Sequence, residues 1–197
     1  MSGGLALVTG AGRGTGRALA LALGAAGARV AAIDVNPDAA SRTAAEIGPS
    51  ASAHVADVSN KMAVQTLLYE LLEANERLAL LVNAAHVAPG SAALKMDEWE
   101  WNRTLDVNLK GAFLMAQTVA RAMKETGGGL ILNVVRPEAG QHAAVRAARS
   151  GLLGLTEALR AEWAPFGVQV EALEAAGDPE RAAAEAVRRA RAVWMAA

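Results

Sequence analysis

The strongest constraint on the fold is a repeated alternation of short apolar runs with longer amphipathic stretches along the chain. Runs such as 5–9, 78–85 and 129–135 are apolar almost throughout and lack the polar–apolar alternation of a half-exposed strand. Strands of this kind are buried on both faces, which is typical of parallel sheets covered by helices. The alternation therefore predicts an α/β fold with a doubly wound parallel sheet of about six strands and helices on both faces.

Apolar periodicity, glycines and prolines give the expected order of elements. Strands are expected at 5–9, 29–34, 52–58, 78–85, 129–135 and 168–173. Helices are expected at 16–27, 37–48, 60–75, 97–125 with a bend near Gly111, 140–164, and from 179 to the end. Because no linker or repeat interrupts the pattern, residues 1–197 are expected to form a single domain.

Three glycines, Gly10, Gly14 and Gly16, lie between the first strand and the first helix, in the segment VTGAGRGTG. Missing side chains let such a turn tighten and let a pyrophosphate approach the backbone, next to the N–H groups of the helix N-terminus. The glycines could also serve only to pack the helix on the strand. Their place in the first strand–helix–strand unit favours phosphate binding, and thus a Rossmann-type dinucleotide-binding fold.

Asp34 ends the second expected strand. A carboxylate at this place can accept hydrogen bonds from the ribose hydroxyls of adenosine, and it would repel a 2′-phosphate. The alternative is an aspartate that only caps the following helix or meets water. The dinucleotide interpretation predicts that NAD is preferred over NADP.

Composition narrows the function classes. A net charge of −1 gives no global field toward nucleic acid or anionic membranes, so neither is an expected partner. The absence of cysteine excludes a disulfide scaffold, a thiolate metal site and a cysteine nucleophile, and no metal site is expected. The first residues lack the basic region of a signal peptide, and no apolar run reaches the length of a membrane span. The chain is therefore expected in the cytoplasm.

Four segments of the sequence resemble motifs of the short-chain dehydrogenase/reductases. These segments are TGAGRGTG (9–16), ADVS (56–59), LVNAAHV (81–87), in which Ala85 replaces a glycine, and LDVNLKGAF (105–113). The resemblance implies NAD as cofactor and a catalytic asparagine at Asn108. It also implies a set of cofactor-binding residues: Gly10, Arg13, Gly14, Thr15, Gly16, Asp34, Asp57, Val58, Asn83, Ala84 and Arg149.

The rest of the family's catalytic set is not matched. The family uses a serine on the fifth strand and a tyrosine and a lysine one helical turn apart, and these positions align with Arg136, Val145 and Arg149. Valine cannot move a proton, and arginine stays protonated at any working pH. Tyr69 precedes the fourth strand and is no substitute. Asn108 is the only retained member of the set.

Three functions remain open from these residues. The first is a catalytically degenerate relative that acts by binding NAD(H) or by associating with a related subunit. The second is an active NAD-dependent oxidoreductase on a small alcohol or carbonyl substrate, with His142 or Glu138 as replacement acid, although both residues are more typical of solvated loops. The third is a protein that binds an anionic ligand through Arg136 and Arg149.

The resemblance also bears on substrate access and assembly. Family members close a mobile segment after the sixth strand over the substrate and add a seventh strand, and both are expected to be missing here. They commonly assemble through their two long helices, which this chain keeps. A homodimer or a hetero-oligomer with a related chain is therefore expected, with some of four aromatic residues at the contact: Trp99, Trp101, Phe113 and Trp163.

Overall fold

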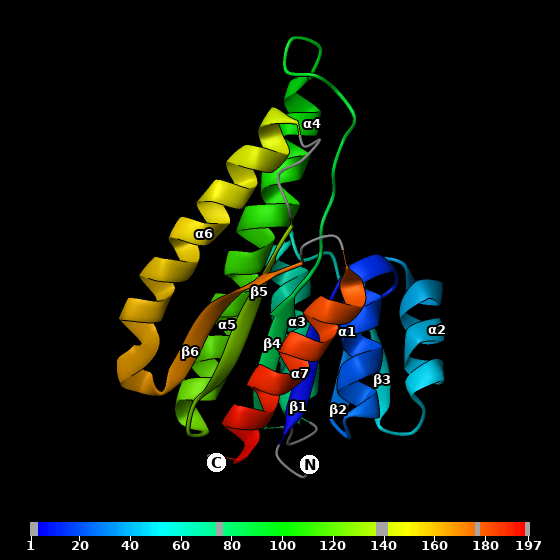
Figure 1. Ribbon diagram of the computed structural model, residues 1–197, viewed down its shortest axis with the longest axis vertical. Coiled ribbons are helices and arrows are strands. Elements are labelled where there is room, and N and C mark those ends of the chain that lie inside the picture. Colours follow the sequence, from blue (N-terminus) through cyan, green and yellow to red (C-terminus); the bar gives the residue numbers. More distant parts are fainter. Residues whose placement is uncertain (1–3, 74–76, 137–141, 176–177, 196–197) are drawn as a thin grey trace.

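The computed structural model describes residues 4–73, 77–136, 142–175 and 178–195. Their strands form one parallel sheet of six strands in the order β3-β2-β1-β4-β5-β6, as expected from the buried apolar runs (Figure 1). The strands are β1 (Leu5–Thr9), β2 (Arg29–Asp34), β3 (Ala51–Val55), β4 (Leu78–Asn83), β5 (Gly129–Val135) and β6 (Val168–Glu174). This order confirms the predicted doubly wound, Rossmann-type fold.

Helices cover both faces of the sheet. One face carries α1 (Gly14–Ala25), α2 (Pro37–Ile47) and α7 (Pro179–Met195), and α7 packs along α1 (Figure 1). The other face carries α3 (Lys61–Glu73), α5 (Ala112–Glu125) and α6 (Ala143–Trp163). Successive β1 side chains enter opposite cores, since Ala6 and Val8 contact the first layer while Leu5 and Leu7 contact the second. This two-sided burial explains why the strand is apolar throughout.

The sheet order creates a crevice at one edge. The chain passes from β1 to β2 and β3 on one side, then crosses to β4 on the other side of β1. The loops after β1 and β4 therefore diverge at the carboxyl ends of neighbouring strands, where open α/β sheets bind ligands. The glycine turn and the segment after Asn83 both open into this crevice.

The long helix expected at 97–125 is divided into three parts. α4 (Glu98–Leu105) is followed by a π-helical turn, η1 (Asp106–Gly111), and then by α5. The expected bend near Gly111 is thus a widened turn, and a Cβ on Gly111 would lie only 2.7 Å from Cγ2 of Val58. Contacts made far along the chain set this irregularity, and helical periodicity does not report them.

Other boundaries shift by a few residues. β3 ends at Val55 rather than at Val58, because the Asp57 side chain accepts a hydrogen bond from the Ser59 backbone and begins a turn. α1 begins at Gly14, before the predicted start. The helix expected at 140–164 is α6 from Ala143, followed by a short 3-10 turn, η2 (Ala164–Phe166).

Candidate functional site

The glycine turn between β1 and α1 is tightly packed on one side and open on the other. A Cβ on Gly16 would overlap the backbone of Gly10, so the turn can close only with hydrogen at that place. Gly14 adopts φ +53° and has no atom within 4 Å of a Cβ position, so its exposed side faces open space. The first turn of α1 contains no acidic side chain that would oppose an anion. The arrangement fits a phosphate group at the N-terminus of α1.

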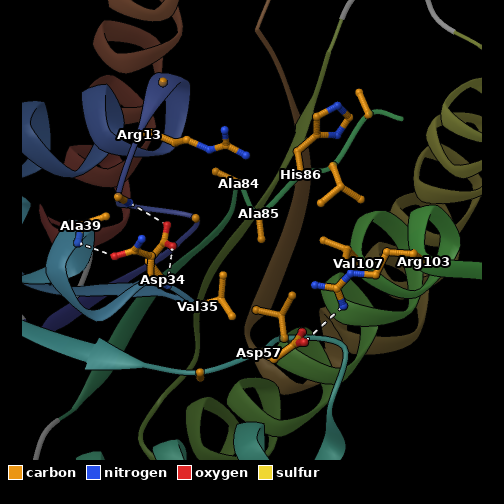
Figure 2. Close-up of a pocket in the computed structure, with 18 of the residues that line it drawn as sticks. Arg13, Asp34, Val35, Ala39, Asp57, Ala84, Ala85, His86, Arg103 and Val107 are labelled. Atoms are coloured by element: carbon orange, nitrogen blue, oxygen red, sulfur yellow. Dashed lines mark hydrogen bonds and ion pairs between the residues drawn. The ribbon is translucent and has the colours of Figure 1, made fainter. Parts of the chain in front are cut away.

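The turn forms one wall of a cleft of about 800 Å³ (Figure 2). The end of β2 and the start of α2 lie beside the turn, and the rest of the lining comes from the segments after β3, β4 and β5, from α4 and from η1. Four arginines and two aspartates line the cleft: Arg13, Arg42, Arg103, Arg136, Asp34 and Asp57. The charged lining of the cleft is therefore net positive, although the whole chain has a net charge of −1.

Asp34 lies at one end of the cleft, beside the glycine turn. Its Oδ2 accepts a hydrogen bond from the Gly12 backbone N–H at 2.8 Å, and its Oδ1 accepts one from the Asn36 N–H at 3.0 Å. Figure 2 shows the carboxylate held between the turn and the start of α2. Asn36, not Asp34, caps α2, since its side chain accepts from the Ala39 N–H. The capping alternative for Asp34 is therefore wrong, and the carboxylate faces the cleft.

Asp57 belongs to a small ionic cluster on the opposite wall of the cleft. Its Oδ1 accepts hydrogen bonds from Ser59, and its Oδ2 pairs with Arg103 Nη1 at 3.2 Å. Burial raises the pKa of Asp57, but the Ser59 hydrogen bonds and the Arg103 charge outweigh it, so the pKa lies below its usual range. The carboxylate is therefore ionised and fixed, and it holds Arg103 against the cleft.

His86 follows β4 and lines the cleft next to two arginines. Burial lowers the pKa of His86, and the charges of Arg136 and Arg13 lower it further, to about 4. Burial and the Arg13 charge also lower the pKa of Arg136, though a guanidinium remains protonated near neutral pH. His86 is thus a neutral imidazole between two cations.

A second, smaller cavity of about 30 Å³ adjoins the cleft, and we call it the inner pocket. The two cavities share Ala85, His86 and Arg136. The inner pocket is otherwise lined by Asn83, Asn108, Ala112, Val134, Val135, Val145, Arg149 and Leu152. A cavity of this size holds about two water molecules.

Asn108 is fully engaged by the loop after β4. Its Oδ1 accepts from the Val87 N–H at 2.9 Å, and its Nδ2 donates to the Val87 carbonyl at 2.8 Å. The amide thus fixes the backbone next to His86. The widened turn η1 carries Asn108, so the irregular helix and this loop are tied together.

A chain of buried hydrogen bonds begins at Asn83, which lines the inner pocket. Asn83 Nδ2 donates to Asn133 Oδ1 at 2.9 Å, and Asn133 Nδ2 donates to Thr156 Oγ1 at 2.9 Å. The chain of bonds joins β4, β5 and α6. Asn83 Oδ1 is buried and has no hydrogen-bond partner among the described residues.

Arg149 is half-buried, is bonded to other groups of the protein, and does not line the cleft. Its Nε donates to the Arg136 carbonyl at 2.9 Å, and its Nη2 lies 3.5 Å from Glu174 Oε1. Arg149 lines only the inner pocket, whereas Arg136 lines both cavities. Of the two arginines expected to bind an anion together, only Arg136 lines the cleft.

The two expected replacement acids are His142 and Glu138. His142 precedes α6 and is half-buried, but it is not among the residues that line the cleft or the inner pocket. Glu138 lies outside the described residues. Val145 is buried against the inner pocket, where the resemblance places a tyrosine in other members of the family.

The structure brings most of the predicted cofactor residues together. Lining the cleft are Gly10, Arg13, Gly14, Asp34, Asp57, Val58 and Ala84. Asn83, Asn108 and Arg149 line the inner pocket, and Thr15 and Gly16 are buried in the first turn of α1. Sequence reasoning missed Arg42, His86, Arg103 and Val107. His86 could have been found from its place directly after the Asn83–Ala85 segment, at the end of a strand beside the switch point.

No helix in the described part of the chain is long and apolar enough to cross a membrane. The same residues contain no group of three or more histidine and carboxylate side chains that could hold a metal ion.

Comparison with known proteins supports this geometry. The sequence model of the short chain dehydrogenases matches residues 4–179. D-threitol dehydrogenase of Mycolicibacterium smegmatis is 38% identical over 180 residues, which cover 88% of this chain and 69% of that protein. NAD-dependent glycerol dehydrogenase of Listeria innocua is 34% identical over 174 residues, which cover 86% of this chain and 68% of that protein.

Solved structures of a short-chain oxidoreductase and of a dehydrogenase are also similar to this chain. A metagenomic short-chain oxidoreductase in complex with NADP superposes with a TM-score of 0.90, at 32% identity, and the match covers 96% of this chain and 91% of that chain. A gluconate 5-dehydrogenase of Burkholderia cenocepacia, in complex with NADP and tartrate, has a TM-score of 0.83 at 31% identity and covers 89% and 72% of the two chains. With its sheet order, its glycine turn and these matches, this chain belongs to the short-chain dehydrogenase/reductase family.

Proposed function

We propose that this protein binds NAD(H) in the cleft but is catalytically degenerate, and that it acts by nucleotide binding or by association with a related subunit. The observation that carries the proposal is the contrast between the two cavities. The cleft of about 800 Å³ has an open glycine turn, an acidic end and a positive lining. None of the described residues lining the adjoining inner pocket is a serine, threonine or tyrosine.

The cleft residues fit a dinucleotide along its length. Adenosine would lie between Asp34 and the Asp57–Val58 segment, with its ribose hydroxyls donating to the Asp34 carboxylate. The pyrophosphate would lie at Gly14, where a side chain is absent and the α1 N-terminus supplies N–H groups. The nicotinamide end would then lie toward Ala84 and the inner pocket. When bound, the cofactor would supply or accept hydride, whereas the protein would supply only position and electrostatics.

Among the described residues, the site offers no proton donor suited to a substrate oxygen. By the family resemblance, Arg136, Val145 and Arg149 stand in the places of serine, tyrosine and lysine. Val145 cannot donate, and Arg149 is already bonded to a carbonyl and Glu174. His86 does reach the inner pocket, but with a pKa of about 4 it carries too little imidazolium near neutral pH to act as a general acid. These observations favour degeneracy over an active enzyme that uses His142, which lines neither cavity; Glu138 lies outside the described residues.

The proposal is tested by calorimetric titration of the protein with NAD and NADH, followed by a turnover assay on the same preparation. Binding of either dinucleotide without turnover supports the proposal. Failure to bind either one would remove the nucleotide function and leave only association.

We further propose that NAD is preferred over NADP, although two structural relatives are complexes with NADP. Asp34→Ala removes an acceptor for the ribose and a repulsive charge at the 2′ position. We expect NAD to bind ~10–100-fold more weakly, from a loss of ~1.5–3 kcal/mol, and the preference over NADP to narrow. The measurement is the ratio of the two dissociation constants by calorimetry.

The matched control is Asp38→Ala, which removes an exposed carboxylate in the first turn of α2 that does not line the cleft. This variant should leave the ratio unchanged. Tighter binding of NADP than of NAD to the unaltered protein would contradict the preference.

Association is proposed through the face formed by α4, η1, α5 and α6, which pack against one another (Figure 1). An apolar groove crosses this face and is lined by Leu105, Leu109, Phe113, Gly151 and Leu155, with Asp106 and Lys110 at its rim. Trp99 and Trp101 on α4 are 71% and 39% exposed, whereas Trp163 packs against the core. Exposed apolar surface of this kind marks contact sites.

We expect light scattering to give the mass of a dimer, either of two copies of this chain or of this chain with a related one. Phe113→Arg places an unpaired charge in the groove and should convert the homodimer to monomer. Leu72→Arg on α3, where leucine is 43% exposed and outside the groove, is the control and should leave the dimer intact. A monomer of the unaltered protein at tens of micromolar, with no related chain co-purifying, would contradict the assignment.

A further inference from the structure

Three basic side chains line the cleft near the place where it joins the inner pocket, which His86 and Arg136 also line. Arg13 comes from the turn before α1, His86 from the segment after β4, and Arg136 from the segment after β5. Figure 2 shows the Arg13 side chain extending across the cleft toward the segment that carries His86. The electrostatic influence of Arg13 on both His86 and Arg136 places the three groups in one local field.

The two arginines of this cluster have no acidic partner in the described part of the chain. Asp34 is bonded to backbone N–H groups, and Asp57 is paired with Arg103. These are the only acidic residues among the described residues that line the cleft or the inner pocket. The half-buried Arg136 guanidinium thus lies close to the like charge of the exposed Arg13, and neither has an acidic partner among the described residues.

Leaving the half-buried Arg136 beside a second positive charge costs free energy, and an anion between the two arginines would recover it through charge-assisted hydrogen bonds. Arg136 stands at the family's serine position, so the group that would polarise a neutral carbonyl is replaced by a fixed positive charge. We propose that Arg13, His86 and Arg136 form a binding site for an anionic group, a carboxylate or a phosphate, at the inner end of the cleft.

His86 couples this site to protons. The charged groups that line the two cavities are Arg13 before α1, Arg42 on α2, Arg103 on α4, Arg136 after β5, Arg149 on α6, Asp34 at the end of β2 and Asp57 after β3. Burial, and after it the charges of Arg136 and Arg13, keep His86 neutral, with a pKa of about 4. An anion bound beside the ring adds an opposite charge, which raises the pKa and favours proton uptake. Anion affinity should therefore increase as the pH falls from neutral toward the His86 pKa.

The negatively charged oxygens that this site would bind could belong to either of two molecules. They belong either to the pyrophosphate of a bound dinucleotide or to an anionic group of a separate ligand. A separate anion would bind in addition to the dinucleotide, whereas a pyrophosphate would compete for the same place. The site itself does not require that NAD be bound.

The experiment titrates the full chain, in chloride-free buffer, with inorganic pyrophosphate and with malonate as a dicarboxylate. Binding is followed by calorimetry and by the NMR titration of the His86 ring, which the variant His86→Gln assigns among three histidines. Each titration is repeated with saturating ADP-ribose. Competition identifies the dinucleotide pyrophosphate as the anion, and additive binding identifies a separate ligand.

We expect at least one of the two anions to bind at millimolar concentrations and to raise the pKa of His86. Arg136→Gln and Arg13→Gln should each weaken that binding by at least ~10-fold, and each should raise the His86 pKa in the absence of anion. The control is Arg17→Gln, which removes an exposed arginine of α1 that pairs with Glu46 outside the cleft. This control should leave both quantities unchanged.

Two results would overturn the proposed anion-binding site. The first is the absence of binding by both anions together with an unmoved His86 pKa. The second is equal weakening by Arg17→Gln and Arg136→Gln, which would reduce the effect to general surface charge. The titration of the unaltered protein keeps the proposal open to refutation even where a variant fails to fold.

Discussion

Replacing Gly16 by valine is expected to unfold this protein or to lower its free energy of unfolding by ~3 kcal/mol or more. The first atom of any side chain at this position would overlap the Gly10 backbone, which is carbonyl oxygen and carbon rather than a flexible side chain. Overpacking against groups that can move costs ~1–3 kcal/mol, and a backbone that cannot yield lies at or beyond the upper end of that range. The loss is measured by chemical denaturation.

The loss should extend to ligand binding, because Gly16 and Gly10 together hold the turn that opens toward the cleft. Any Gly16→Val protein that remains folded should bind NAD much more weakly than the unaltered protein. The matched control is Gly154→Ala on α6, where no atom lies within 4 Å of the new Cβ. Alanine is the better helix former, so this variant should gain ~0.5–1 kcal/mol. A Gly16→Val variant within ~0.5 kcal/mol of the unaltered protein, the range of ordinary surface substitutions, would refute the steric argument.

The sheet could be predicted because its strands are buried on both faces, so that their sequences carry a continuous apolar signal. Leu5–Thr9 and Arg29–Asp34 were predicted with the bounds that the structure has. The long helix was harder to predict from the sequence, because its widened turn η1 is packed against Val58 and carries Asn108, which bonds to Val87. Those contacts join segments far apart in the sequence, and local periodicity contains no trace of them.

The site residues also fall into those that the sequence indicates and those that only the fold brings together. The glycine turn and Asp34 were predictable because their chemistry follows from their places at the ends of β1 and β2. Arg42 and Arg103 were missed because a helical arginine can point to solvent or to a ligand, and only the fold decides. The sequence predicts Arg136 and Arg149 as a joint anion site, but sequence alone does not show where either guanidinium lies. In the structure, Arg149 donates to the Arg136 carbonyl, and Arg13 is the cation whose charge acts on the Arg136 side chain.

For hydride transfer, we expect turnover of the unaltered protein to stay below ~1 s⁻¹ on every ketone and aldehyde tried with NADH. A carbonyl oxygen gains negative charge as hydride arrives, and it needs a proton donor. Loss of a positioned general acid typically costs ~10²–10⁴ in rate. Arg136 could stabilise part of the developing charge, but it cannot protonate the oxygen. The measurement is NADH oxidation followed by absorbance over a broad substrate panel.

Restoring the family's side chains should rescue a trace of activity at most. The variant Arg136→Ser, Val145→Tyr, Arg149→Lys must place a phenol where Val145 is 2% exposed, beside a cavity of about 30 Å³. Arg149→Lys also removes the guanidinium that bonds the Arg136 carbonyl. The matched control carries Val145→Phe in the same background, which adds the ring without the hydroxyl. Any gain that is present with tyrosine and absent with phenylalanine reports proton donation and not repacking. Turnover of ~1 s⁻¹ or more by the unaltered protein would overturn degeneracy. If replacing His142 or Glu138 then abolished that turnover, the residue concerned would be the acid.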